Sequence, residues 1–197
     1  MQLRDVAIYG VHAAFWAAFG VTQRFVGAGH AVKESAPAAD VARTGPYSRL
    51  VLGVHFLAFG VMYLGIGGAV FSDRVPAWFP GQRSAGTAVM TLGAWLTCWS
   101  LVYFRSWRFR AQLNADHELA TGGPYAIVRH PIYAGMNLLA VGTALWVPTL
   151  LTWIAVALMF LGSDLRGRVE ERVLTEAFGQ RYRTYCARTR RFVPGLY

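Results

Sequence analysis

Four short motifs in the last third of the chain carry side chains that could bind and orient a small charged ligand. In order, they are Gly123-Pro124-Tyr125, Arg129-His130-Pro131-Ile132-Tyr133, the segment from Arg166 to Glu171, and the segment from Phe178 to Tyr185. Between the second and third motifs, the apolar run up to Leu161 is long enough to cross a bilayer and return. We therefore expect the polar motifs to meet on one side of a membrane.

The second motif places a histidine at the start of a helix. Proline suits the first turn of a helix and biases the preceding His130 toward an extended conformation. The free backbone N–H groups and the helix dipole at such an N-terminus favour an anion, for example the carboxylate of a cofactor. The alternative is a plain helix cap at the membrane interface, with Arg129 extending to lipid head groups. The neighbouring motifs favour the binding site.

Arg166 and Glu170 are four residues apart and so share one face of a helix that leaves the membrane. The usual meaning of this spacing is an ion pair on a solvated face. Arginine before glutamate is the less favourable order for such a pair, which weakens that interpretation. Glu171 points to another side of the helix, where we expect a structural role.

In their order and spacing, the motifs resemble the isoprenylcysteine carboxyl methyltransferase family of integral membrane methyltransferases. The resemblance covers residues 105–197, whereas the first hundred residues are similar only in being membrane-spanning. No single motif is specific, but four motifs in order around a membrane hairpin make a strong signal. The resemblance implies that S-adenosyl-L-methionine is the methyl donor.

The resemblance also implies roles for individual residues. The implied cofactor-binding residues are His117, Leu119, Tyr125, Arg129, His130, Tyr133 and Glu170. The implied catalytic residues are Glu170 and Arg166, the latter orienting the acceptor. Tyr125 would stack on adenine, although an interfacial packing role fits it equally well. The family often has a glutamine before the histidine; here Arg110 has the equal spacing and Gln112 fits with a shift, so both stay open.

Methyl transfer from a sulfonium is an in-line displacement, which is catalysed by positioning and desolvation. A carboxylate or thiolate acceptor is already an anion and needs no general base, which agrees with the lack of an obvious catalytic dyad. We expect a lipophilic acceptor to enter sideways from the bilayer. A carboxylate, a thiol or an amino lipid would each serve, and the sequence does not choose among them.

The composition predicts a polytopic membrane protein with an all-α fold. Of 197 residues, 55% are hydrophobic and only 15% are charged, a higher apolar share than in soluble domains. We expect one structural domain, with residues 1–104 as a three-helix transmembrane scaffold and residues 105–197 as the catalytic segment. The two cysteines lack the spacing of a metal site, and we expect no metal.

Five membrane helices are predicted. They cover about residues 6–26, 50–71 and 85–104, followed by two helices of about fifteen residues each between Pro131 and Leu161. The last two are short for a bilayer, so they should form a tight hairpin with Pro148 at its turn. A separate amphipathic tail helix should follow, running over residues 166–185, with Gly179 allowing close packing or a bend. The segment from Arg191 to Pro194 should then pin the tail to the bundle.

The basic residues predict the orientation of the chain. The net charge is +9, and with the open end of the hairpin in the cytoplasm, sixteen of the nineteen basic residues lie inside. By the positive-inside rule, the N-terminus is outside and the C-terminus is cytoplasmic, in the inner (plasma) membrane. Arginines beside membrane spans meet lipid head groups, so we expect membrane lipids and not nucleic acid as partners.

Two other functions remain open. Membrane sterol and steroid reductases, which use NADPH, resemble the C-terminal pattern through Gly179, Tyr182, Tyr185 and Cys186. The shorter chain and the Arg-His-Pro-x-Tyr motif favour the methyltransferase. A non-catalytic transporter would use His12 and His55, which lie inside predicted spans, where ionisable residues often have functions. Nothing in the sequence connects these two histidines to the tail motifs.

Overall fold

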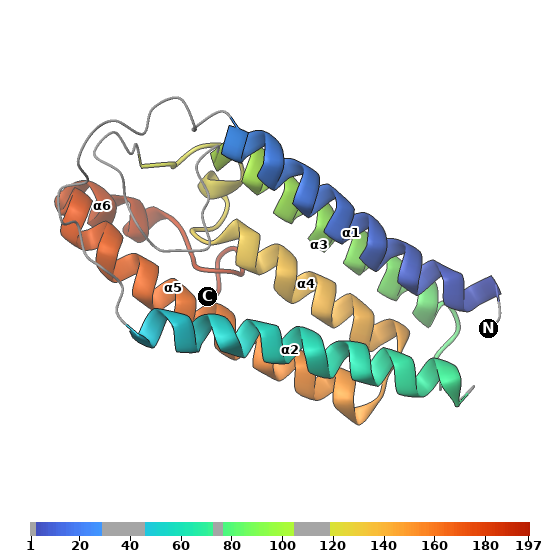
Figure 1. The fold of residues 1–197 in the computed structure, drawn as a ribbon. Coiled ribbons are helices and arrows are strands. Elements are labelled where there is room, and N and C mark those ends of the chain that lie inside the picture. The colour runs from blue at the N-terminus through green and yellow to red at the C-terminus, as the bar shows by residue number, and fades with distance from the viewer. Residues whose placement is uncertain (1–2, 29–45, 73–76, 105–118) are drawn as a thin grey trace.

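The computed structural model describes residues 3–28, 46–72, 77–104 and 119–197. This part of the chain is helical apart from its loops, as Figure 1 shows. Its helices are α1 (Leu3–Ala28), α2 (Pro46–Phe71), α3 (Gln82–Phe104), the 3-10 helix η1 (Gly123–Ala126), α4 (Pro131–Trp146), α5 (Leu150–Phe178) and α6 (Gln180–Arg188). The predicted all-α fold is confirmed.

Helix α4 lies at the centre of the bundle. It packs against α3 on one side and against α5 on the other, while α1 covers α3 and α2 covers α5 (Figure 1). Because α4 begins with the second motif, this arrangement places His130 and Tyr133 among helices from both halves of the chain.

Three of the helices are long and apolar enough to cross a membrane. By length and composition, these are Leu50–Phe71, Gln82–Phe104 and Leu150–Phe178, and Ala7–Thr22 is a shorter apolar helix. The chain is therefore a multi-pass membrane protein. The count of five spans stays a prediction for α1 and for the 16-residue α4.

The hairpin between α4 and α5 turns where the sequence predicts. Helix α4 ends at Trp146, and Thr149 caps α5 by accepting a hydrogen bond from the Thr152 backbone N–H at 3.3 Å. The Thr152 hydroxyl oxygen accepts in return from the Thr149 backbone N–H at 3.1 Å. This reciprocal capping box follows Pro148, which cannot continue a helix. The turn at Pro148 is confirmed.

The predicted tail helix over residues 166–185 is wrong at both ends. Helix α5 runs without interruption for 29 residues from Leu150 to Phe178, so the fifth span and the polar motif share one helix. The chain then breaks at Gly179, whose φ of 52° is in the region that favours glycine, and α6 starts at Gln180. The bend foreseen at Gly179 is confirmed. The rigid α5 carries the third motif directly from the membrane to the site.

Glycines allow α3 and α4 to pack unusually closely. Gly86 and Gly93 on α3 face Gly142 and Gly135 on α4, a spacing of seven residues on each helix. A Cβ added at Gly135 would lie 2.6 Å from the Gly93 carbonyl oxygen and would also overlap the Thr97 hydroxyl. Small residues at such seams let membrane helices approach one another at backbone distance.

We expect Gly135→Ala to destabilise the protein by about 3 kcal/mol, at the upper end of the cost of overpacking, because the atom that it meets is backbone. Thermal unfolding in detergent measures the effect. Gly60→Ala on α2 is the matched control, since a Cβ there meets nothing within 4 Å. Equal unfolding temperatures for the two variants would contradict the close seam.

Candidate functional site

The Gly122-Gly123-Pro124 turn leads from α3 into the site. Gly123 has a φ of 56°, and both glycines lie directly against the ring of Tyr103. A Cβ on either residue would overlap that ring, so the turn needs glycine for space as well as for its backbone angle. Pro124 then starts the short η1 helix, which carries Tyr125 into the core.

Tyr125 is buried by packing from two sides. Its ring stacks on Phe104 of α3 at 5.5 Å, and its carbonyl oxygen accepts a hydrogen bond from the Tyr185 hydroxyl of α6 at 2.7 Å. Burial, together with the charge of Glu170, raises the pKa of Tyr125 well above its usual value, so the phenol stays neutral. The packing role is observed, and the predicted stacking on adenine stays a prediction.

His130 is the N-cap of α4, with Pro131 in the first turn. The His130 side chain makes no capping hydrogen bond to this helix end, and free backbone N–H groups at a helix N-terminus favour an anion. The ring of His130 is buried, stacking on Tyr133 at 5.8 Å and packing on Phe192 at 5.9 Å. The predicted helix start is confirmed, and the ligand site at this helix end stays a prediction.

Two carboxylates flank the His130 ring. Its Nδ1 is 3.5 Å from Glu170 Oε2, and its Nε2 is 3.3 Å from Glu171 Oε1. Burial lowers the pKa of His130, but the hydrogen bonds and charges of the two glutamates outweigh it and raise that pKa above its usual value. A carboxylate faces each nitrogen, so the surroundings favour the protonated ring, which donates to both.

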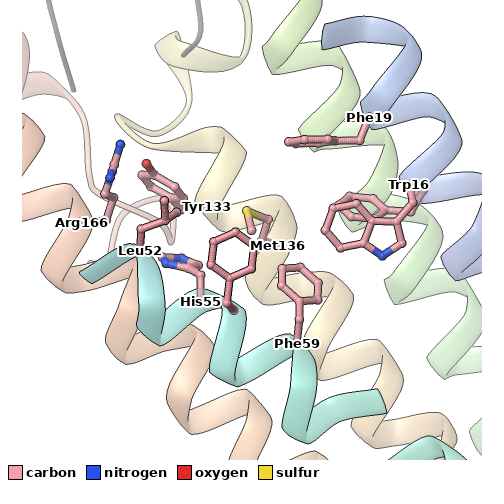
Figure 2. A pocket seen from close by; sticks show the side chains of 10 residues that line it. Trp16, Phe19, Leu52, His55, Phe59, Tyr133, Met136 and Arg166 are labelled. Carbon is pink, nitrogen blue, oxygen red and sulfur yellow. The ribbon is translucent and has the colours of Figure 1, made fainter. Parts of the chain in front are cut away.

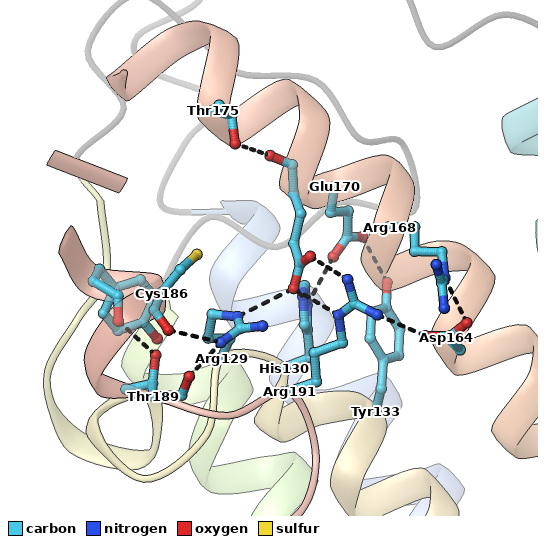
Figure 3. A network of polar contacts seen from close by, with 12 residues as sticks. Arg129, His130, Tyr133, Asp164, Arg168, Glu170, Thr175, Cys186, Thr189 and Arg191 are labelled. Atoms are coloured by element: carbon cyan, nitrogen blue, oxygen red, sulfur yellow. Dashed lines mark hydrogen bonds and ion pairs between the residues drawn. The ribbon is translucent and has the colours of Figure 1, made fainter. Parts of the chain in front are cut away.

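Glu170 is the meeting point of three motif residues. Its Oε1 accepts a hydrogen bond from the Tyr133 hydroxyl at 2.6 Å, while Oε2 faces His130 (Figure 3). The same Oε1 accepts a second hydrogen bond from Arg166 Nε at 3.0 Å. Arg166 is only 3% exposed, whereas the Glu170 side chain is 22% exposed. The Arg166–Glu170 pair therefore does form, but within a buried network and not on a solvated face.

Glu171 binds two arginines from other segments of the chain, contacts that its position in the sequence does not predict. It receives Arg129 Nε at 3.1 Å, and Arg191 binds it with two nitrogens, at 2.9 and 2.6 Å. Arg129 also donates to the backbone carbonyls of Cys186 and Thr189. These bonds join the segment just before α4 to α5, α6 and the C-terminal tail. Figure 3 shows Arg129 directed toward Cys186 and Thr189. The structure gives Arg129 this structural role; its contact with the cofactor stays a prediction.

The tail docks on the start of α4 through its backbone. The backbone N–H of Arg129 donates to the Arg190 carbonyl at 2.6 Å, and that of His130 donates to the Arg191 carbonyl at 3.1 Å. Phe192 is buried against the His130 ring. The predicted pinning of the tail by the segment starting at Arg191 is confirmed.

We expect Arg191→Ala to lower the stability of the protein by about 2 kcal/mol, since it removes the hydrogen-bonded cation that bridges two partly buried carboxylates. Arg191 bridges Glu171 and Asp164, so its loss should also free the tail. Thermal unfolding and limited proteolysis of the tail measure both effects. The exposed Arg190→Ala is the matched control, and equal proteolysis of the two variants would contradict this role.

The loop before η1 is described only from Leu119 onward. His117 lies outside the described residues, as do Arg110 and Gln112, so their roles at the cofactor stay predictions. Leu119 is described and is buried with Tyr182 and Tyr185 of α6 in a small second cluster.

A cavity of about 90 Å³ opens beside this polar network. Its ten lining residues come from α1, α2, α4 and α5, and include Tyr133 and Arg166 as well as Trp16 and His55. Figure 2 shows Arg166 and Tyr133 at one end of the cavity and Trp16 near the other. The two residues that bond Glu170 thus also form one end of an apolar chamber.

The cavity residues of α1 and α2 were not predicted from the sequence. The sequence shows no connection between His55 and the tail motifs, but in the structure His55 lines the same cavity as Arg166, and its ring lies 5.6 Å from that of Tyr133. An ionisable residue within a span was the available signal, but which helix it faces depends on the fold. Residues 1–104 therefore supply part of the site as well as a scaffold.

Comparisons with known proteins agree with this arrangement. The family model described as phospholipid methyltransferase matches residues 82–181. A protein-S-isoprenylcysteine O-methyltransferase of Schizosaccharomyces pombe is 36% identical over 85 residues, which is 41% of this chain and 35% of the relative. Protein-S-isoprenylcysteine O-methyltransferase B of Arabidopsis thaliana is 36% identical over 117 residues, 58% of this chain and 54% of the relative. The matches thus span about a third and about a half of these relatives' lengths.

A solved structure shares the fold. The eukaryotic intramembrane Ras methyltransferase, isoprenylcysteine carboxyl methyltransferase, aligns with a TM-score of 0.66 at 20% sequence identity. The alignment covers 100% of this chain and 69% of that chain.

Proposed function

The chain belongs to the phospholipid methyltransferase family, and on that premise we propose that it is a membrane enzyme that transfers a methyl group from S-adenosyl-L-methionine to a lipophilic acceptor. One observation carries the proposal. Tyr133 and Arg166 both bond Glu170 Oε1, and both line the apolar cavity. A polar site for a cationic donor therefore adjoins an apolar chamber for a lipid.

The residues present fit S-adenosyl-L-methionine, which carries a sulfonium, an ammonium and a carboxylate. The uncapped N-terminus of α4 offers backbone N–H groups to the carboxylate. Glu170 offers its partly exposed carboxylate to a cationic group. His117, Leu119 and Tyr125 would complete the cofactor site from the loop before α4, in the roles that the sequence predicts.

The cavity fits the hydrocarbon part of an acceptor. Apart from its polar end, it is lined mainly by aromatic and aliphatic side chains within the membrane helices. The curated relatives are named for a prenylated cysteine, which is also a lipid-bearing acceptor. For this chain we propose a carboxylate, a thiol or an amino lipid whose chain lies in the cavity and whose head group reaches Arg166.

The protein's part in the reaction is to position the two reactants and to exclude water. The bound cofactor supplies an electrophilic methyl group. Glu170, held by Tyr133 and His130, would orient the donor, and Arg166 would hold a carboxylate or thiolate acceptor at the end of the cavity. The docked tail, with Phe192 against His130, keeps water from the site, which strengthens these charge interactions. The site would face the cytoplasm, with the N-terminus outside.

A methyl-transfer assay tests the proposal. The protein, in lipid nanodiscs, is given S-adenosyl-L-methionine labelled in the methyl group together with farnesoic acid, farnesyl thiol or farnesylamine. We expect label in the lipid product of at least one acceptor, and its loss in Glu170→Ala but not in Glu176→Ala, an exposed glutamate of the same helix. Absence of label with all three acceptors, in a wild type that binds the cofactor, would contradict a lipophilic acceptor.

A further inference from the structure

A chain of hydrogen bonds joins three helices beside the end of the cavity that is remote from Arg166. Trp16 Nε1–H of α1 donates to the Tyr63 hydroxyl oxygen of α2 at 2.6 Å, and that hydroxyl is 3.2 Å from Nδ1 of His12. Nε2 of His12 is 3.0 Å from the Thr143 hydroxyl of α4. Thr143 in turn donates to the Leu139 carbonyl at 2.7 Å.

The neighbouring hydrogen bonds determine which group donates and which accepts at each step of this series. Because the Tyr63 oxygen already accepts from Trp16, its own proton is donated to His12 Nδ1. Because the Thr143 proton is donated to a carbonyl, its oxygen accepts from His12 Nε2–H. His12 is therefore a neutral ring with its proton on Nε2, the form that suits its 3% exposure. The series of hydrogen bonds ends on a backbone carbonyl, so it fixes the positions of these side chains and does not carry protons onward.

The hydrogen-bond chain holds the end wall of the cavity. Trp16 of α1 lies 5.0 Å from Phe59 of α2, ring to ring, and both line the cavity. These two rings meet across the space between α1 and α2 (Figure 2). Trp16 lines the cavity and is also 40% exposed, so its indole lies at the boundary between the cavity and the surface of the bundle. Along α2, the lining residues from Leu52 to Phe59 cover about 10 Å of helix.

We propose that Trp16, held in place by Tyr63 and His12, sets the length of the hydrocarbon chain that the enzyme accepts. The inference rests on the proposed function, since it takes the occupant of the cavity to be the single hydrocarbon chain of the methyl acceptor. The head group lies at Arg166, and the chain runs past Tyr133 toward Trp16. A chain that is too long meets the indole.

The hydrogen bond from Trp16 to Tyr63 restricts the movement of the indole. An indole fixed only by apolar contacts can turn aside to admit a longer chain, but turning Trp16 breaks its bond to Tyr63 and leaves a polar group without a partner in the membrane. One methylene in a firm apolar pocket changes kcat/KM by about 10-fold or more. Tyr63 and His12 are thus positioning residues that act through Trp16.

Chain-length preference tests the proposal directly. The probes are octanoate, laurate and palmitate, together with the alkanethiols and alkylamines of the same lengths, so that the choice of head group does not decide the result. Thermal stabilisation by each probe is measured in nanodiscs for wild type, Trp16→Ala and Tyr63→Phe, in the presence of S-adenosylhomocysteine. Tyr63→Phe keeps the ring and removes only the hydroxyl. Tyr9→Ala, which removes an exposed aromatic ring of α1 outside the cavity, is the control.

We expect the longest probe that stabilises wild type to be shorter than the longest that stabilises Trp16→Ala. The ratio of long-chain to short-chain affinity should rise by about 10-fold in Trp16→Ala and by a smaller factor in Tyr63→Phe, with no change in Tyr9→Ala. The same preference in wild type and Trp16→Ala would overturn the proposal. If wild type showed this chain-length preference but did not bind S-adenosylhomocysteine, the proposed function would be wrong. The role of Trp16 in limiting chain length would then still hold.

Discussion

Replacing Glu170 by alanine is expected to weaken binding of S-adenosylhomocysteine by at least about 100-fold, or about 2.7 kcal/mol. The carboxylate is the one group that Tyr133, Arg166 and His130 share, and part of it is exposed toward the proposed cofactor. Its removal takes away the countercharge for a cationic donor and leaves the buried Arg166 without this carboxylate. Removing one partner of a buried ion pair typically costs about 3–5 kcal/mol.

Calorimetric titration measures this effect, with Glu176→Ala beside it. Both variants remove one glutamate from α5, but Glu176 is exposed to solvent. Glu176→Ala should bind as wild type does. A folded Glu170→Ala protein that bound the cofactor product normally and turned over at full rate would refute the assigned role of Glu170.

Replacing Arg166 by glutamine is expected to lower kcat/KM for methyl transfer by about 100- to 1,000-fold, the usual loss when a preorganised donor is removed from a reacting anion. Binding of S-adenosylhomocysteine should fall by less than about 10-fold, since Glu170 keeps Tyr133 and His130 as partners. We expect kcat/KM to fall more than cofactor binding because Arg166 lines the acceptor cavity.

The matched control is Arg172→Gln, which changes an exposed arginine of the same helix. It should leave both quantities unchanged. Equal losses in cofactor binding and turnover for Arg166→Gln would mean that Arg166 serves only to hold Glu170, and the acceptor role would then be wrong.

That the polar motifs come together was predictable, because it follows from the length of the apolar run and from the turn at Pro148. An apolar run that folds as a helical hairpin, with Pro148 between its halves, returns the chain to the end of the bundle where it started. His130 and Glu170 then come together, as the structure shows. The helix start at Pro131 and the bend at Gly179 follow from the backbone limits of proline and glycine.

The length of α5 was not predictable in the same way. Polar residues from Ser163 onward mark the end of an apolar run, but they do not mark the end of a helix. Side-chain bonds within the helix, such as Arg168 Nε to Asp164 at 2.6 Å and Arg166 to Glu170, accompany its continuation. Hydropathy therefore predicts two helices where the structure has one continuous helix.

The roles of Glu171 and His55 depend on the tertiary fold. Helix periodicity shows that Glu171 points away from Glu170, but not that Arg129 and Arg191 arrive there from other segments. His55 is close to Tyr133 only because α2 packs on α5, beside α4. Neither contact has a signature in the local sequence.

Calorimetric titration of the purified wild-type protein with S-adenosylhomocysteine tests directly whether the polar site binds the methyl donor. We expect saturable binding at one site per chain. A well-folded wild type that gave no saturable binding would contradict this expectation, and saturable binding of NADPH instead would identify the site as that of a reductase.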